Sequence, residues 1–264
     1  MPTSIRDTKE RFTDRVDDYV RARPGYPRAL VDDLAAAEVL SPGAVVADVG
    51  SGTGISTELF LAAGYEVVGI EPNAPMRTAA ENSLAKYPRF RSLPGSAEAT
   101  GLADASVDLV VAAQAFHWFD VARARAEFRR ILRPGGAVAL VWNARRAAGT
   151  PFLEGYEKLL LDHGTDYRLV GHRGIGPDRL AAFFGGPYET RRGENFQDLD
   201  LDGLRARLLS SSYVPAAGKP GHDAILAGLA DLFERHQHAG RVRLEYDVDL
   251  FLGPLGEAGD QATP

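Results

Sequence analysis

The chain has 264 residues, 45% of them hydrophobic, and a formal net charge of −6. This length and composition can bury one substantial core, which predicts one main domain with insertions. The acidic balance gives no positive footprint for a nucleic-acid backbone, and the absence of cysteine excludes disulfides, thiolate metal sites and cysteine nucleophiles. The first 15 residues are polar, and no apolar run approaches the roughly 18 residues of a membrane span. We therefore expect a cytoplasmic protein that binds neither nucleic acid nor a membrane.

The first half of the chain alternates predicted helices and strands. Helical patterns cover residues 3–21 and 27–40, and the first ends at Arg23-Pro24-Gly25-Tyr26-Pro27. Five apolar runs are typical of strands, at residues 44–49, 66–70, 90–93, 107–112 and 137–142. Helical patterns separate them at residues 55–63, 74–86 and 121–132. Strands that alternate with helices form a parallel sheet, so these residues predict a doubly wound α/β core.

The region after Asn143 departs from this alternation. Helix candidates stand among glycine-rich and charged segments, at residues 152–162, 177–184, 201–209 and 224–238. Residues 188–196 and 242–252 alternate polar and apolar side chains, as strands with one exposed face do, and we expect them to complete a seven-stranded sheet. We predict four parts, which are an N-terminal helical lid at 1–40, the sheet core at 41–143, cap insertions with the sixth strand at 144–240, and the last strand and tail at 241–264.

A glycine-rich loop follows the first predicted strand. The run Asp48-Val49-Gly50-Ser51-Gly52-Thr53-Gly54 places glycines at alternate positions before a helix. Glycine permits positive φ and has no Cβ, so a ligand can lie against main-chain N–H groups at the helix N-terminus. A dinucleotide-binding loop has its third glycine where this chain has Ile55. The spacing favours a nucleoside without a pyrophosphate, and Asp48 suits an ammonium group. An NAD-dependent oxidoreductase is the alternative.

A second acid, Glu71, follows the strand predicted at residues 66–70. It stands about 20 residues after the first glycine, where a carboxylate can accept hydrogen bonds from both hydroxyls of a ribose. The alternative is a helix N-terminal acid before Pro72-Asn73, which the helix dipole favours. The first interpretation makes Glu71 part of the nucleoside site.

Residues 114–120 follow the fourth predicted strand, whose carboxyl end borders the ligand crevice of an open α/β sheet. His117 can accept a proton from an attacking hydroxyl or amine, which makes it the candidate catalytic residue. Phe116 and Trp118 are candidate substrate contacts, because aromatic rings can shield a cationic or an apolar ligand. The alternative is that His117 and Trp118 only support the start of the next helix.

Four separated motifs resemble those of one family. They are the run at residues 48–54, Glu71, the segment Gly95-Ser96-Ala97-Glu98-Ala99-Thr100-Gly101-Leu102 before residues 106–111, and residues 128–136. Their order resembles that of class I S-adenosylmethionine (SAM)-dependent methyltransferases of the type 11 branch. The likeness covers residues 40–143 and implies a Rossmann-like sheet of strand order 3-2-1-4-5-7-6 with an antiparallel seventh strand. The segment His117-Trp118-Phe119 is similar to a subgroup that includes relatives of trans-aconitate methyltransferase.

The resemblance also implies which residues bind SAM. The acid and glycines of the loop would hold the methionine portion together with Gln114, and Glu71 would hold the ribose. Many relatives have Asp where this chain has Ser96, so the contact with the adenine amino group would come from Glu98 or from the main chain. Tyr19 and Arg23, one helical turn apart, would meet the carboxylate, unless they belong to a solvated surface helix. The full set is Tyr19, Arg23, Asp48, Gly50, Ser51, Gly52, Thr53, Gly54, Glu71, Pro72, Asn73, Met76, Ala97, Glu98 and Gln114.

Together these patterns predict a SAM-dependent methyltransferase that acts on a small-molecule acceptor, as a monomer or homodimer. A SAM-utilising cyclase or lyase on the same fold, or a non-catalytic SAM-binding module, are the alternatives, because fold does not establish a reaction. The other histidines lack ligand spacing, so we expect no metal site. The pairs Arg145-Arg146 and Arg191-Arg192 are typical of solvated arginines, with recognition of an anionic substrate as the alternative.

Overall fold

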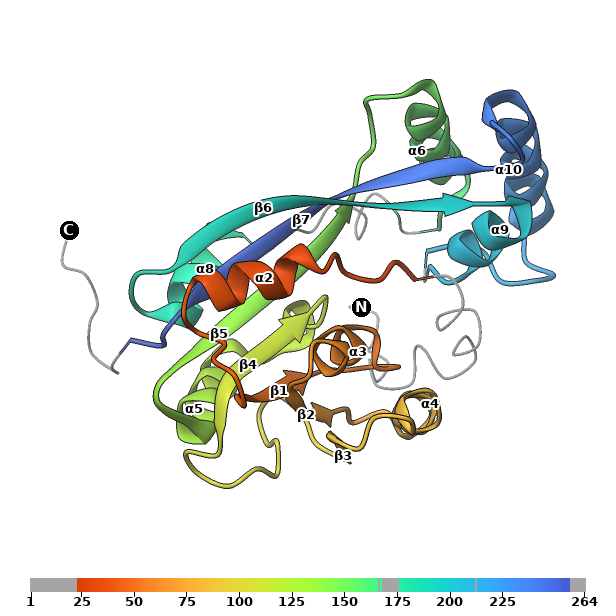
Figure 1. Cartoon of the computed structure of the whole chain (residues 1–264). Coiled ribbons are helices and arrows are strands. Elements are labelled where there is room, and N and C mark those ends of the chain that lie inside the picture. The colour runs from red at the N-terminus through yellow and green to blue at the C-terminus, as the bar shows by residue number, and fades with distance from the viewer. Residues whose placement is uncertain (1–22, 166, 168–175, 212, 257–264) are drawn as a thin grey trace, which may run out of the picture.

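The computed structural model describes residues 23–165, 167, 176–211 and 213–256. Its centre is a seven-stranded sheet of order β3-β2-β1-β4-β5-β7-β6 (Figure 1). The first five strands run parallel, and β7 lies antiparallel between β5 and β6. The predicted Rossmann-like class and strand order are confirmed. The predicted helix at residues 3–21, and Tyr19 within it, lie outside the described residues.

The parallel half holds β1 at its centre, between β2 and β4. Its strands are β1 Val45–Val49, β2 Glu66–Ile70, β3 Phe90–Leu93, β4 Val107–Ala113 and β5 Leu132–Arg145. Helices cover both faces of the sheet, so β1 can be apolar on both sides. Val46 belongs to one core and its neighbour Ala47 to the other. β5 is longer than predicted, because its pairing with β7 continues as far as Arg145 opposite Tyr246.

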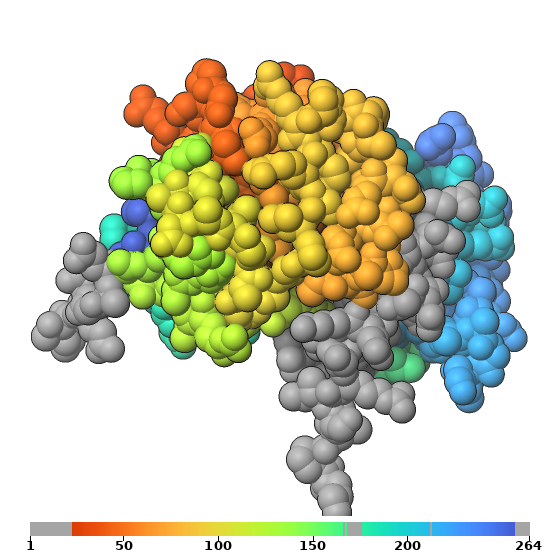
Figure 2. All heavy atoms as spheres, turned by 90° about the horizontal axis from the view of Figure 1, so that it is seen from below, coloured from red at the N-terminus to blue at the C-terminus, as the bar shows by residue number. Residues whose placement is uncertain are grey.

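Two groups of helices form the two cores. One face is covered by α2 Ala29–Ala36, α3 Ile55–Ala62 and α4 Ala74–Leu84. The other face is covered by α5 Val121–Ile131 and α8 Pro177–Phe184. Figure 2 views the molecule from below, where the orange and yellow segments around α4 and β3 occupy the middle of the surface and the blue cap lies at the right edge.

The cap forms a third core around the far end of the long antiparallel strands. These strands are β6 Glu189–Leu199 and β7 Val242–Gly253, and the helices are α6 Pro151–His163, α9 Leu201–Leu209 and α10 His222–His236. Leu244 and Tyr246 of β7 are buried among the helices. Figure 1 shows α6, α9 and α10 gathered beyond the parallel half. Within the described ranges, no helix has both the length and the apolar character needed to cross a membrane.

Candidate cofactor-binding site

The glycine loop between β1 and α3 needs glycine for two different reasons. Gly50, Gly52 and Gly54 have φ values of +73°, +57° and +88°. A Cβ on Gly54 would lie only 2.6 Å from Cδ1 of Leu84, so this glycine lets the loop pack on α4. A Cβ on Gly52 would meet no atom within 4 Å. Gly52 therefore leaves its main chain open to a ligand.

Asp48, in β1, is a fully buried acid. Its Oδ2 accepts hydrogen bonds from Ser56 Oγ at 2.7 Å and Thr57 Oγ1 at 2.6 Å, while its Oδ1 has no hydrogen-bond partner among the described residues. Burial raises the pKa of Asp48, against the two hydroxyl bonds that favour the charged form. Unpartnered buried polar atoms are rare in native structures and call for a ligand or another specific explanation.

Glu71 follows β2 and connects it to the glycine loop. Its Oε2 accepts a hydrogen bond from the main-chain N–H of Gly52 at 2.9 Å, and its Oε1 accepts one from Asn73 at 2.8 Å. Burial raises the pKa of Glu71, and these two N–H groups partly oppose that rise. The N-terminal cap of α4 is Asn73, whose Oδ1 accepts from the N–H of Met76 at 3.0 Å. Glu71 is thus placed against the loop, and the direct capping bond comes from Asn73.

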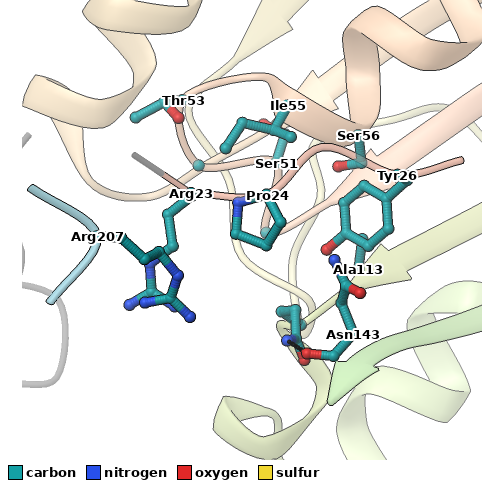
Figure 3. A pocket seen from close by; sticks show the side chains of 13 residues that line it. Arg23, Pro24, Tyr26, Ser51, Thr53, Ile55, Ser56, Ala113, Asn143 and Arg207 are labelled. Atoms are coloured by element: carbon teal, nitrogen blue, oxygen red, sulfur yellow. Dashed lines mark hydrogen bonds between the residues drawn. The ribbon is translucent and has the colours of Figure 1, made fainter. Parts of the chain in front are cut away.

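A cavity of about 510 Å³, its open mouth included, lies beside the loop (Figure 3). Its wall combines the glycine loop, the end of β4, residue 143 of β5, the segment before α2, and α9 of the cap. The predicted cofactor residues that the structure brings together here are Arg23, Gly50, Ser51, Gly52, Thr53 and Gln114.

Two amide side chains form the floor between β4 and β5. Gln114 has φ +56°, and its Nε2 donates to the Asn143 carbonyl at 2.8 Å. Asn143 Nδ2 in turn donates to the Gly25 carbonyl at 3.2 Å. Among the described residues, neither Gln114 Oε1 nor Asn143 Oδ1 has a hydrogen-bond partner, although both atoms are buried. The two oxygens are acceptors beside the cavity, and the sequence analysis did not identify Asn143.

The residues predicted for adenine lie away from this cavity wall. Ala97 is 3% exposed, and Glu98 Oε1 accepts a hydrogen bond from the Asp120 N–H at 3.0 Å. Ser96 pairs with Ala99 in an isolated bridge. Pro72, Met76, Ala97 and Glu98 remain predicted adenine or ribose contacts.

Phe116 begins a single 3₁₀ turn, Phe116–Trp118, after β4. Its side chain is fully buried and meets Phe183 edge to face, with 4.8 Å between ring centroids. The Arg179 guanidinium lies 5.1 Å from the Phe116 ring centroid and donates to the Phe116 carbonyl at 3.1 Å. Core packing accounts for Phe116, and its role as a substrate contact stays a prediction.

His117 and Trp118 lie at the surface of the same turn. The His117 ring packs 4.3 Å from the Trp118 ring and 5.2 Å from Trp142, centroid to centroid, and Trp118 is 42% exposed. Neighbouring protein atoms desolvate the His117 ring although part of the residue is exposed to solvent, and this desolvation together with the positive charge of Arg179 lowers the pKa of His117 to about 4. His117 is therefore neutral at pH 7. The described residues that line the cavity do not include His117 or Trp118, so the roles predicted for both stay predictions.

The paired arginines of the cap and sheet edge are held in ion pairs. Their acidic partners are Glu157 for Arg145, Asp247 for Arg146, Glu189 for Arg191 and Asp249 for Arg192. Arg145 is not solvated, because its side chain is only 9% exposed and lies over the Tyr156 ring. Among the described residues, no cluster of acids and histidines is arranged to hold a metal ion.

Comparison with known proteins identifies the family. A family model described as a methyltransferase domain matches residues 47–140, which contain the glycine loop and the strands β2 to β4. An uncharacterized methyltransferase-like protein of Schizosaccharomyces pombe is 30% identical over 253 residues, covering 91% of this chain and 93% of the relative. The chain belongs to the class I SAM-dependent methyltransferase family.

Two further similarities agree with membership of this methyltransferase family. An uncharacterized methyltransferase of Mycobacterium tuberculosis is 41% identical over 145 residues, and the match spans 55% of this chain and little more than half, 57%, of that relative. A solved structure from Anaeromyxobacter dehalogenans, described as a type II methyltransferase, is 27% identical, with a TM-score of 0.63 over 88% of this chain and 98% of that one. The family predicted from the motifs is confirmed.

Proposed function

We propose that this chain transfers a methyl group from SAM to a small-molecule acceptor. The observation that carries the proposal is a set of four buried oxygens that lack hydrogen-bond partners among the described residues; three belong to residues that line the cavity, and Asp48 is hydrogen-bonded to Ser56 of its wall. They are Asp48 Oδ1, Thr53 Oγ1, Gln114 Oε1 and Asn143 Oδ1. Acceptors of this kind complement the ammonium N–H donors of the methionine portion of SAM.

The residues around the cavity fit the rest of that cofactor. Glu71 would bind the ribose, since its carboxylate already lies against the loop at Gly52. Arg23 would bind the SAM carboxylate, because its side chain lines the cavity and a guanidinium fork matches a carboxylate. Pro72, Asn73, Met76, Ala97 and Glu98 would surround the nucleoside. When bound, SAM supplies an activated methyl group for in-line attack by the acceptor.

The protein's own contribution to the reaction is mainly positioning. The glycine loop and the amide floor would fix the sulfonium, and the cap would exclude water from the acceptor. His117 would accept the acceptor's proton where that proton must leave, since the neutral imidazole predominates at pH 7. Trp118 would cover the acceptor, while Phe116 would support the turn from the core.

Calorimetry with S-adenosylhomocysteine (SAH) and NAD tests the cofactor assignment. We expect SAH to bind with a dissociation constant on the order of micromolar, and NAD to bind far more weakly. NAD binding as tight as that of SAH would contradict the assignment. Product analysis after incubation with SAM then separates the reactions, because methyl transfer releases SAH, whereas cyclisation or elimination of the amino-acid chain of SAM releases methylthioadenosine.

A further inference from the structure

Arg207 of α9 reaches the same cavity from the cap, and the sequence did not single it out. Figure 3 shows its side chain and that of Arg23 entering the cavity on the same side of the view, opposite Tyr26. Arg207 is 6% exposed. Its Nε donates to Tyr246 Oη at 3.2 Å and its Nη1 to Ser211 Oγ at 3.1 Å. Both partners are neutral hydroxyl groups.

Burial without an acidic partner distinguishes Arg207 from the other described arginines of the cap and sheet edge. Arg243 pairs with Asp198 at 2.7 Å, and Arg192 pairs with Asp249 at 2.7 Å. Among the described residues, no carboxylate lies within 4.0 Å of the Arg207 guanidinium, whose surroundings are instead the phenols of Tyr156, Tyr213 and Tyr246. An arginine stays charged in a protein, and a buried charge is costly unless it is paired.

The charges around the cavity point to an anionic ligand beyond SAM. The described residues that line the cavity include two arginines, Arg23 and Arg207, and no acid. SAM carries a sulfonium and an ammonium against one carboxylate, so it adds a net positive charge. The single SAM carboxylate can occupy Arg23, which leaves Arg207 without an anion.

We propose that Arg207 binds a carboxylate of the acceptor, so that the substrate is an organic acid. The inference rests on the proposed function, because SAM must occupy the Arg23 side of the cavity. The two bonds to Tyr246 and Ser211 use one N–H of Nε and one of Nη1, and Nη2 makes no hydrogen bond to the described residues. Nη1 and Nη2 therefore keep donors for a carboxylate, and the neutral partners fix the guanidinium without neutralising it.

Benzoate and benzamide are suitable probes, since they share a shape and differ in charge. With the protein saturated with SAH, we expect benzoate to bind the wild type at least about tenfold more tightly than benzamide, measured by calorimetry or saturation-transfer NMR. Arg207→Met should abolish this preference, Arg207→Lys should keep part of it, and the matched surface control Arg243→Met should keep all of it. The SAH dissociation constant should change by less than about threefold in all three variants.

Different results identify different failures. A wild type that does not prefer benzoate overturns the proposal without any variant, so it remains testable if Arg207→Met fails to fold. A preference that survives in Arg207→Met also overturns it. A loss of SAH affinity on the order of tenfold in both Arg207 variants, with the benzoate preference kept, assigns Arg207 to the SAM carboxylate instead. Failure of the wild type to bind SAH contradicts the proposed function itself.

Discussion

On the glycine-loop side of the cavity the buried ionisable groups are acids, whereas on the cap side the buried group is a base. Asp48 and Glu71 are desolvated carboxylates whose pKa values are raised, and Arg207 is a guanidinium among phenols. Among the described residues, none of the three belongs to an ion pair within 4.0 Å, whereas exposed groups such as Arg243 and Asp198 do. The exposed acids and arginines of this comparison balance one another in ion pairs, whereas the three buried groups beside the cavity are left for a ligand to balance.

The largest change should come from removing the acid that touches the loop. Glu71→Ala should weaken SAH binding by roughly 10- to 100-fold, about 1.5–3 kcal/mol, because charge-assisted hydrogen bonds are lost. The matched control is Glu66→Ala, at the other end of β2, where the side chain is half-exposed and pairs with Arg91 at 3.4 Å. Calorimetry should show nearly wild-type SAH affinity for this control. Equal SAH affinities in wild type and Glu71→Ala would show that Glu71 does not bind the ribose and is only an acid at the start of a helix.

A smaller effect, with opposite signs for binding and stability, is expected for Asp48→Asn. Burial raises the folded-state pKa of Asp48 above its usual 3.8. The folded state therefore favours the protonated acid, and this stabilisation is lost as the pH rises through the folded pKa. Asn resembles the neutral acid at every pH, so Asp48→Asn should raise or maintain the melting temperature at pH 7 while weakening SAH binding about tenfold, the effect of one hydrogen bond to a charged group.

Asp198→Asn gives the opposite test on the cap side. Arg243 lowers the pKa of Asp198, so this acid stabilises the folded protein above its unfolded pKa and loses that contribution as the pH falls. The variant should melt slightly below wild type at pH 7 and bind SAH normally, because the pair is largely exposed. If Asp48→Asn instead lowered the melting temperature as Asp198→Asn does, buried and surface acids would not differ in the way proposed.

The glycine-loop side and the cap side of the cavity also differ in how much of each the sequence predicts. The bounds of β2 and β3 agree with the apolar runs at residues 66–70 and 90–93, because strand periodicity and flanking turns are local patterns. The glycine loop is likewise local, and Arg23 and Gln114 line the cavity beside it, while their cofactor contacts stay predictions. A local sequence pattern is therefore sufficient to predict these strands and the glycine loop.

Arg207 could not be found in this way. Arg205 lies on the same helix, is 44% exposed and pairs with Asp202, and the two arginines look alike in the sequence. The packing of the cap core buries Arg207, and its Nε then meets Tyr246 of β7. Asn143 also depends on tertiary structure, because its side chain reaches Gly25 across 118 residues. Tertiary contacts decide which polar residues become part of a site.

The smallest expected effect concerns His117, which follows β4 and lies beside Trp142 and Arg179. Desolvation and the Arg179 charge lower the folded-state pKa of His117 to about 4 from its usual 6.5. A base with a lowered pKa binds its proton less readily when folded, so its contribution is complete above pH 6.5 and is lost as the pH falls towards 4. His117→Asn should have the wild-type melting temperature at pH 8. Between pH 8 and pH 5 its melting temperature should fall slightly less than that of wild type. The difference is small because solvent weakens the effect at an exposed residue.

NMR titration of the His117 ring measures this pKa directly and tests its cause. Arg179→Gln should raise the midpoint, because it removes the nearby positive charge, whereas Arg179→Lys should leave it low. A wild-type midpoint near 6.5 would show that the ring is not desolvated. A low midpoint means that the His117 ring is uncharged at pH 7 until it accepts a proton, so it adds no positive charge to that of Arg207, where the proposed carboxylate binds.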